Sequence, residues 1–164
     1  LAQLDAGAIE AETHRARLGE VVSTAVATVG LQAEEKGLSL VAELNGAEDA
    51  LCSPRLARVI QNLLVNALHY TERGAVRLVA RRRGEAVRIE VWDTGPGIPP
   101  AERERVFLPF QRHGDRSNGP GVGLGLAVAR GLVTAVGGQL AVHDTEGGGT
   151  TMVVSLPCPD GPAS

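Results

Sequence analysis

Three short segments of the chain carry groups that could bind a nucleotide. The first is a helical stretch with Asn62 and Asn66, the second runs from Asp93 to Ile98 at the end of a strand, and the third runs from Gly121 to Leu126 at the start of a helix. They offer two amides on one helix face, a carboxylate before a glycine turn, and a glycine-rich helix entry. Together they could recognise a purine, hold a metal ion and bind phosphates.

The two asparagines lie four residues apart, so both side chains occupy one face of the predicted helix. Asparagine is a poor helix-interior residue, so two of them in an apolar helix need an explanation. Each could cap a nearby loop, or the carbonyl oxygens could face a phosphate-bound Mg²⁺, which prefers oxygen ligands. His69 and Tyr70 extend the same face by one turn and could reach phosphate, although a lone histidine is more often structural.

The carboxylate of Asp93 ends a predicted strand and could accept a hydrogen bond from the exocyclic amine of adenine. Gly95 and Gly97 would let a base lie against the backbone. The alternative is an ordinary aspartate turn.

The glycines of the third segment would form an anion site from their amides and the helix dipole. No strand directly precedes them, which excludes a Rossmann fingerprint, and no Gly-Lys-Ser/Thr is present, which excludes a P-loop.

Composition narrows the class of protein. The chain has 164 residues, 43% of them hydrophobic, which is enough for one domain with a core. A net charge of -3 argues against general nucleic-acid binding. Two distant cysteines suggest a reducing compartment. No signal peptide is visible, and the longest weakly polar run, Val21 to Leu31, is too short to span a bilayer.

Hydrophobic periodicity predicts the elements that position these segments. Helices are expected at 1–11, 18–36, 54–71, 101–106 and 122–136, and strands at 38–44, 75–83, 86–93, 139–144 and 150–156. Ser53 and Pro54 are expected at the N-cap and first position of the third of these helices in chain order. The long polar segment from Thr94 to Pro120 is expected to be functional or mobile. This order predicts a mixed sheet with helices on one face, a two-layer α/β sandwich.

Five motifs in this order resemble the GHKL superfamily, and most closely the ATP-binding catalytic domain of two-component sensor histidine kinases. The likeness covers roughly residues 18–157. The matching stretches are Asn62 to Tyr70 (N box), Asp93 to Ile98 (first glycine box), Phe107 to Phe110 with Arg112 (F box), Gly121 to Leu126 (the glycine box closing the ATP lid) and Gly149-Thr150 (the last Gly-Thr motif). The resemblance implies a Bergerat-type fold: a mixed, mostly antiparallel sheet with about three helices on one face and a long ATP lid.

The resemblance also implies roles. Asp93 would read adenine, Asn66 with Asn62 would hold Mg²⁺, and Arg112 would stabilise charge at the γ-phosphate. Phe107 would anchor the lid or simply pack in the core. The residues placed at the ATP are Asn62, Asn66, His69, Tyr70, Asp93, Gly95, Gly97, Ile98, Phe110, Gly121, Val122, Gly123, Leu124, Gly125, Leu126 and Thr150.

Two positions depart from the family pattern. His69 stands where the N box commonly has lysine, so its charge would depend on pH. Ser53 stands where an aspartate often precedes the helix.

Position 62 separates the branches of the superfamily. The hydrolytic members carry a glutamate there as general base, whereas this chain has an amide, which cannot take the proton. We therefore expect a protein-histidine kinase domain that is a poor ATPase by itself. The competing interpretation is an ATP-gated, non-catalytic interaction module.

In the family, the phosphorylated histidine lies in a separate helical-hairpin domain. None of the four histidines of the chain has that context. Residues 1–17 resemble the end of that hairpin and its linker, and residues 18–157 resemble the ATP-binding domain. Residues 158–164 are rich in proline and glycine and are expected to form a disordered tail. The resemblance further implies a downstream response regulator, a membrane-anchored parent with this portion in the cytoplasm, and a monomeric fragment.

Overall fold

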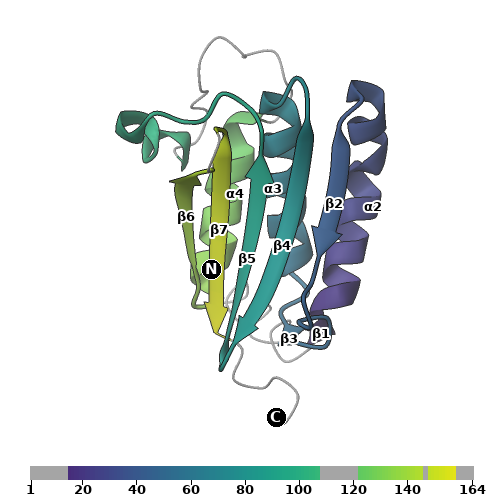
Figure 1. Ribbon diagram of the computed structural model, residues 1–164. Helices are drawn as coiled ribbons and strands as arrows, with labels where there is room; N and C mark the ends of the chain where they lie inside the picture. The colour runs from purple at the N-terminus through teal and green to yellow at the C-terminus, as the bar shows by residue number, and fades with distance from the viewer. Residues whose placement is uncertain (1–14, 108–121, 146–147, 158–164) are drawn as a thin grey trace.

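The computed structural model describes residues 15–107, 122–145 and 148–157, without the side chains of residues 122–124. In this part of the chain, three α-helices cover one face of a five-stranded sheet (Figure 1). The helices are α2 (Leu18–Lys36), α3 (Leu56–Tyr70) and α4 (Val122–Ala135). The strands of the sheet are β2 (Ser39–Glu43), β4 (Ala75–Arg83), β5 (Ala86–Asp93), β6 (Gln139–Asp144) and β7 (Thr150–Pro157).

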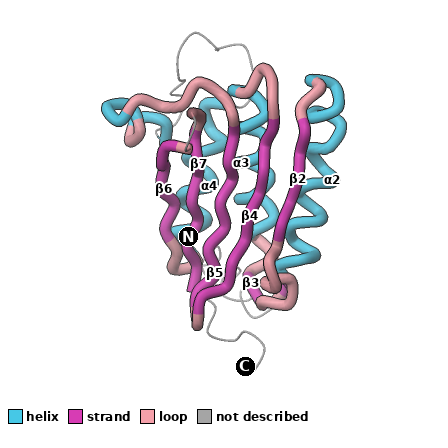
Figure 2. The backbone as a smooth tube through the Cα atoms, viewed as in Figure 1, coloured by secondary structure: helices cyan, strands magenta, loops and turns pink. Residues whose placement is uncertain are grey.

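The strand order is β2-β4-β5-β7-β6 (Figure 2). Strands β2 and β4 are parallel, and the other neighbours are antiparallel. Parallel strands cannot be joined by a tight turn, and the chain crosses between them through α3. The predicted mixed, mostly antiparallel two-layer sandwich is therefore confirmed.

The core lies between the sheet and the helices, with α3 packed between α2 and α4. Six apolar side chains at helical spacing on α3 are buried in this core. They are Leu56, Val59, Ile60, Leu63, Leu64 and Ala67. No helix among the described residues is long and apolar enough to cross a membrane.

Several local predictions need correction. Helix α3 begins at Leu56, because Ser53 caps a preceding turn: its Oγ accepts a hydrogen bond from the N–H of Arg55 at 3.2 Å. The predicted helix at 101–106 is two 3₁₀ turns, η1 (Pro100–Glu102) and η2 (Arg105–Phe107), since the segment is too short for stable α-helix.

Two further strands were not predicted. These short strands, β1 (Ala16–Arg17) and β3 (Leu51–Cys52), pair antiparallel with each other. The predicted helix at 1–11 and the tail from 158 lie outside the described residues.

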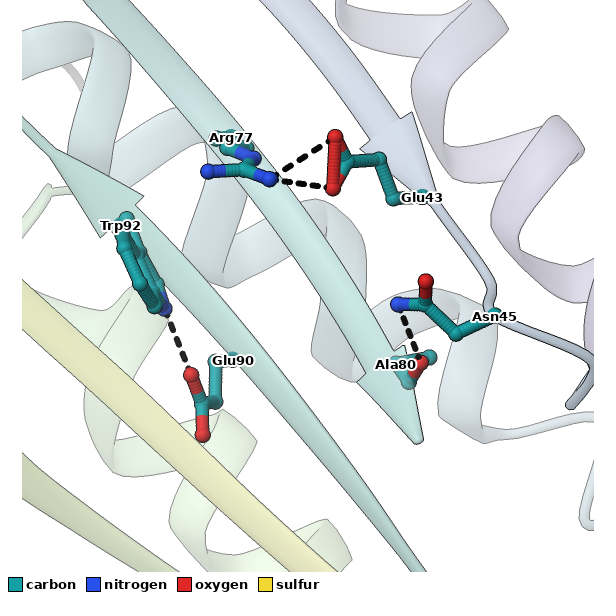
Figure 3. Close-up of polar contacts among 6 residues, drawn as sticks. All are labelled: Glu43, Asn45, Arg77, Ala80, Glu90 and Trp92. Atoms are coloured by element: carbon teal, nitrogen blue, oxygen red, sulfur yellow. Dashed lines mark hydrogen bonds and ion pairs between the residues drawn. The ribbon is translucent and has the colours of Figure 1, made fainter. Parts of the chain in front are cut away.

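The sheet face away from the helices carries a polar layer (Figure 3). Arg77 on β4 donates to the carboxylate of Glu43 on β2, and its guanidinium lies 5.5 Å from the centre of the Trp92 ring. The Trp92 Nε1 donates in turn to Glu90 at 2.7 Å. Asn45 donates to a main-chain carbonyl of β4 at 3.1 Å. These contacts tie β2, β4 and β5 together across the open face.

Candidate functional site

The end of α3, the end of β5 and the start of β7 meet at one recess. Its lining comes from three of the five sequence motifs, and it includes Pro96, which lies within the Asp93 to Ile98 motif but was not among the predicted site residues. The lining residues are Asn66, Tyr70, Asp93, Pro96, Gly97, Ile98 and Thr150.

Asp93 is the buried carboxylate of this recess, with 6% of its surface exposed. Its Oδ1 accepts hydrogen bonds from the N–H of Gly95 at 2.9 Å and from the N–H of Thr150 at 3.2 Å. The second bond follows from the register of β5 and β7, which pairs Trp92 with Thr151. Because both bonds go to Oδ1, Oδ2 keeps its capacity to accept from a ligand amine.

Burial raises the pKa of Asp93 above its ordinary value of 3.8, because the ionised form loses solvation. The two backbone hydrogen bonds lower the pKa and only partly offset burial. Protonation of Asp93 at Oδ2 would remove one of the lone pairs with which this oxygen can accept a hydrogen bond from an adenine amine.

Two glycines allow the backbone segments of the recess to approach one another. A Cβ at Gly149 would lie 2.0 Å from the carbonyl oxygen of Asp93, and this glycine has φ +102°. A Cβ at Gly95 would lie 2.9 Å from the carbonyl oxygen of Tyr70. The close neighbour of Gly95 is thus the end of α3, which adds a structural reason for this glycine to the one expected from the sequence.

The polar residues of α3 take different positions. Asn66 is buried and lines the recess, whereas Asn62 donates from Nδ2 to the carbonyl oxygen of Gly125 at 3.1 Å and so ties α3 to the start of α4. The ring of His69 packs edge-to-face on Tyr70 at 5.1 Å. His69 is not among the residues that line the recess.

The glycine-rich segment is described from Val122, the first residue of α4. Gly123 therefore lies in the first turn, where N–H groups lack acceptors within the helix. Leu126 is buried in the core. The predicted site residues Phe110, Arg112 and Gly121 lie outside the described part of the chain, as do the side chains of Val122 and Leu124.

The segment from Ile98 to Phe107 packs against the domain. Both of these end residues are buried. The guanidinium of Arg130 on α4 lies 4.8 Å from the centre of the Phe107 ring and donates to Glu104 at 3.3 Å. Arg103 pairs with Asp144 at the end of β6. The first part of the predicted mobile lid is therefore anchored, and Phe107 both packs in the core and contacts α4.

The two asparagines of α3 offer amide oxygens, the kind of ligand that magnesium prefers. Within the described residues, no group of three or more His, Cys, Asp and Glu side chains could hold a metal ion. Mg²⁺ is usually held by few protein oxygens together with substrate phosphates. The amide oxygens of Asn66 and Asn62 fit that chemistry.

Sequence reasoning also missed Lys36, whose ammonium contacts the end of α3. A signal was present: Lys36 is the only lysine among 16 lysines and arginines of the chain.

Comparison with known proteins identifies the family. Residues 52–160, more than half of the chain, match the histidine kinase-, DNA gyrase B- and HSP90-like ATPases. The chain belongs to this ATPase family. The recess thus lies in a domain of the histidine kinase-like ATPases, with the sheet and helices that the resemblance predicted.

The chain is similar over most of its length to sensor proteins. The sensor protein KdpD of Mycobacterium tuberculosis (strain CDC 1551 / Oshkosh) is 42% identical over 162 residues, which cover 96% of this chain and 19% of KdpD. The chain therefore spans about a fifth of that relative's length.

Solved structures share the fold. Full-length ShkA, crystallised with AMPPNP, is 30% identical with a TM-score of 0.76, over 92% of this chain and 32% of ShkA. The catalytic domain of histidine kinase ThkA is 23% identical with a TM-score of 0.76, over 88% of this chain and 96% of that domain. ThkA has also been crystallised with the response regulator protein TrrA.

Proposed function

We propose that the chain binds Mg-ATP and donates the γ-phosphate to a histidine on a separate helical-hairpin domain. The geometry of Asp93 carries the proposal. Two main-chain N–H groups hold Oδ1, and Oδ2 can accept from the exocyclic amine of adenine. Guanine has no amine at that edge. The crystallisation of ShkA with AMPPNP, an ATP analogue, supports a nucleotide as the ligand.

The phosphate end of ATP would lie toward α3 and the start of α4. Asn66 and Asn62 would hold Mg²⁺ through their amide oxygens, and the first-turn N–H groups of α4 would bind phosphate. Bound magnesium would offset the phosphate charge. Arg112 remains the candidate for stabilising charge during transfer.

Asn62 favours transfer over hydrolysis. Its amide cannot act as a general base, so an attacking water would not be activated. A neutral imidazole already carries a lone pair and needs less help. The Asn62 bond to Gly125 also fixes the start of α4 relative to α3.

The partners of the whole protein are part of the same proposal. Residues 1–17 would complete the acceptor hairpin and its linker, and residues 158–164 would follow the domain as a tail. A response regulator would receive the phosphoryl group, as the ThkA–TrrA complex suggests by analogy. The parent would be a membrane-anchored sensor with this portion in the cytoplasm, and the isolated domain would be a monomer.

A transfer assay tests the proposal. The chain is mixed with a separate hairpin domain carrying the acceptor histidine and with ATP labelled in its γ-phosphate. The hairpin should gain acid-labile, Mg²⁺-dependent label, while a hairpin with that histidine replaced by alanine should gain none. If the chain binds ATP and the intact hairpin stays unlabelled, the ATP-gated interaction module becomes the better account.

A companion variant tests the role of Asn62. Asn62→Glu installs a carboxylate at the hydrolytic position, and ATP hydrolysis should rise above that of the unmutated chain. Asn62→Gln, which has the same length without the carboxylate, should not raise it. Brisk hydrolysis by the unmutated chain, or stable phosphohistidine on the chain alone, would contradict the kinase proposal.

A further inference from the structure

The last residue of α2 closes the end of a different helix. Lys36 donates from Nζ to the carbonyl oxygen of Leu68 at 2.5 Å and to that of His69 at 3.2 Å. Both carbonyls belong to the last turn of α3. Lys36 is the single lysine of the sequence; the other residues among its 16 lysines and arginines are all arginines.

The chemistry of a helix end explains this contact. The last four carbonyl groups of a helix lack N–H donors within the helix, and they carry a partial negative charge. A compact ammonium with three donors can satisfy two adjacent carbonyls and place a positive charge beside them. The residue after α3, Thr71, is extended at φ −96° and ψ 120°, so α3 lacks the left-handed cap that often closes a helix.

The turn that Lys36 closes is also a wall of the recess. Asn66 and Tyr70 line the recess from this end of α3. The carbonyl oxygen of Tyr70 lies so close to Gly95 that a Cβ there would be only 2.9 Å away. The N–H of Gly95 is in turn bound to Oδ1 of Asp93 at 2.9 Å. A shift of the last turn of α3 would therefore move the loop that orients Asp93.

We propose that Lys36 is a positioning residue for the nucleotide recess. By holding the carbonyls of Leu68 and His69, it fixes the last turn of α3, and that turn fixes Gly95 and Asp93. The inference rests on the proposed function, since it takes the recess to be the adenine site. Lys36 itself is not among the residues that line the recess.

The test compares three variants for ADP affinity, thermal stability and hydrogen exchange. Lys36→Met removes the charge and the donors, and it should weaken ADP binding roughly three- to tenfold. Lys36→Arg keeps both features and should recover most of the affinity. Arg58→Met is the matched control, because Arg58 is an exposed cation near the start of α3, the helix whose other end Lys36 contacts. The ADP affinity of Arg58→Met should stay within about twofold of the unmutated chain.

Hydrogen exchange separates positioning from general stability. Without nucleotide, the Gly95 amide should exchange faster in Lys36→Met than in Arg58→Met, at temperatures equally far below each variant's melting temperature. Unchanged ADP affinity and unchanged Gly95 exchange in a folded Lys36→Met protein would overturn the inference and leave Lys36 as a stabilising cap only. If the unmutated chain binds no adenine nucleotide, the proposed function fails, and Gly95 exchange alone still decides the positioning claim.

The single lysine allows a test without substitution. An amine-directed acetylating reagent should weaken ADP binding by the unmutated protein, in proportion to Lys36 acetylation measured by mass spectrometry. The Lys36→Arg protein treated in the same way carries acetylation at its α-amino group only and should keep its affinity. An equal loss of ADP affinity in both proteins would contradict the positioning role of Lys36.

Discussion

The recess around Asp93 and the neighbouring segment from Ile98 to Phe107 are held by different kinds of contact. The recess depends on main-chain groups: a buried carboxylate accepts two backbone N–H groups, and Gly149 packs directly on the Asp93 carbonyl. Between its buried ends, the segment is held by two arginines, whose partners Asp144 and Glu104 have side chains 76% and 83% exposed. Substitutions in the recess should therefore have large effects. Substitutions in the segment should change the free energy of unfolding only weakly and in a salt-dependent way.

The largest effect is expected at Gly149. Gly149→Ala would place a Cβ 2.0 Å from the Asp93 carbonyl oxygen at φ +102°. Gly148 has a similar φ of +110°, but a Cβ there meets nothing within 4 Å. Gly148→Ala should therefore carry only backbone strain, roughly 1 to 3 kcal/mol, and Gly149→Ala should lose at least about 2 kcal/mol more. Urea denaturation of both variants measures this gap, and equal stabilities would show that the close approach does not constrain the fold.

The next effect is on nucleotide binding at Asp93. Asp93→Asn can keep the two backbone bonds through its amide oxygen, but it places a donor where the adenine amine needs an acceptor. The fold should persist while ATP affinity falls at least roughly tenfold. Asp144→Asn, at the exposed end of β6, is the control and should bind ATP normally. Isothermal titration decides, and an Asp93→Asn protein that binds ATP as tightly as the unmutated chain would exclude the adenine assignment.

The pKa of Asp93 predicts how stability depends on pH. Because the folded-state pKa is raised above 3.8, the folded state favours the protonated form. The contribution of Asp93 to the free energy of unfolding is therefore fully present below pH 3.8 and is lost as pH rises through the raised pKa. Relative to Asp93→Asn, the unmutated chain should lose stability over that interval. A pH series of urea denaturations measures the difference, and the opposite slope would contradict the burial effect.

The smallest effect is expected in the segment beside the recess. Arg130→Met should lower the free energy of unfolding by about 1 kcal/mol, from loss of the contact with Phe107 and the pair with Glu104. Glu104→Gln removes only the ion pair and should cost about 0.3 kcal/mol, less at high salt. A loss at Arg130 as large as that at Gly149 would mean that the segment is not the weaker of the two regions.

The sequence predicted the fold where local signals are strong. Strands β4 and β5 match their predicted bounds because alternating side chains flank the turn at Gly84 and Glu85. The pair β1 and β3 escaped prediction because two residues per strand give no periodicity. The start of α3 was predicted too early, because Ser53 and Pro54 suit an isolated turn as well as the start of a helix.

The site was predictable as a set of residues but not as a geometry. Motif order identified Asp93 and Thr150, yet the bond between them uses the main-chain N–H of Thr150, which depends on the register of β5 and β7. Lys36 was missed because its partners are main-chain carbonyls 32 and 33 residues away, which leave no trace in side-chain spacing.

The most direct test of the central claim is one titration series of the unmutated chain with ATP, ADP and GTP, with and without Mg²⁺. The account predicts that ATP and ADP bind and that Mg²⁺ strengthens ATP binding. GTP should bind at least roughly tenfold more weakly, because guanine has no amine at the edge where Asp93 accepts a hydrogen bond from adenine. Equal affinity for GTP and ATP, or no binding of any adenine nucleotide, would contradict it.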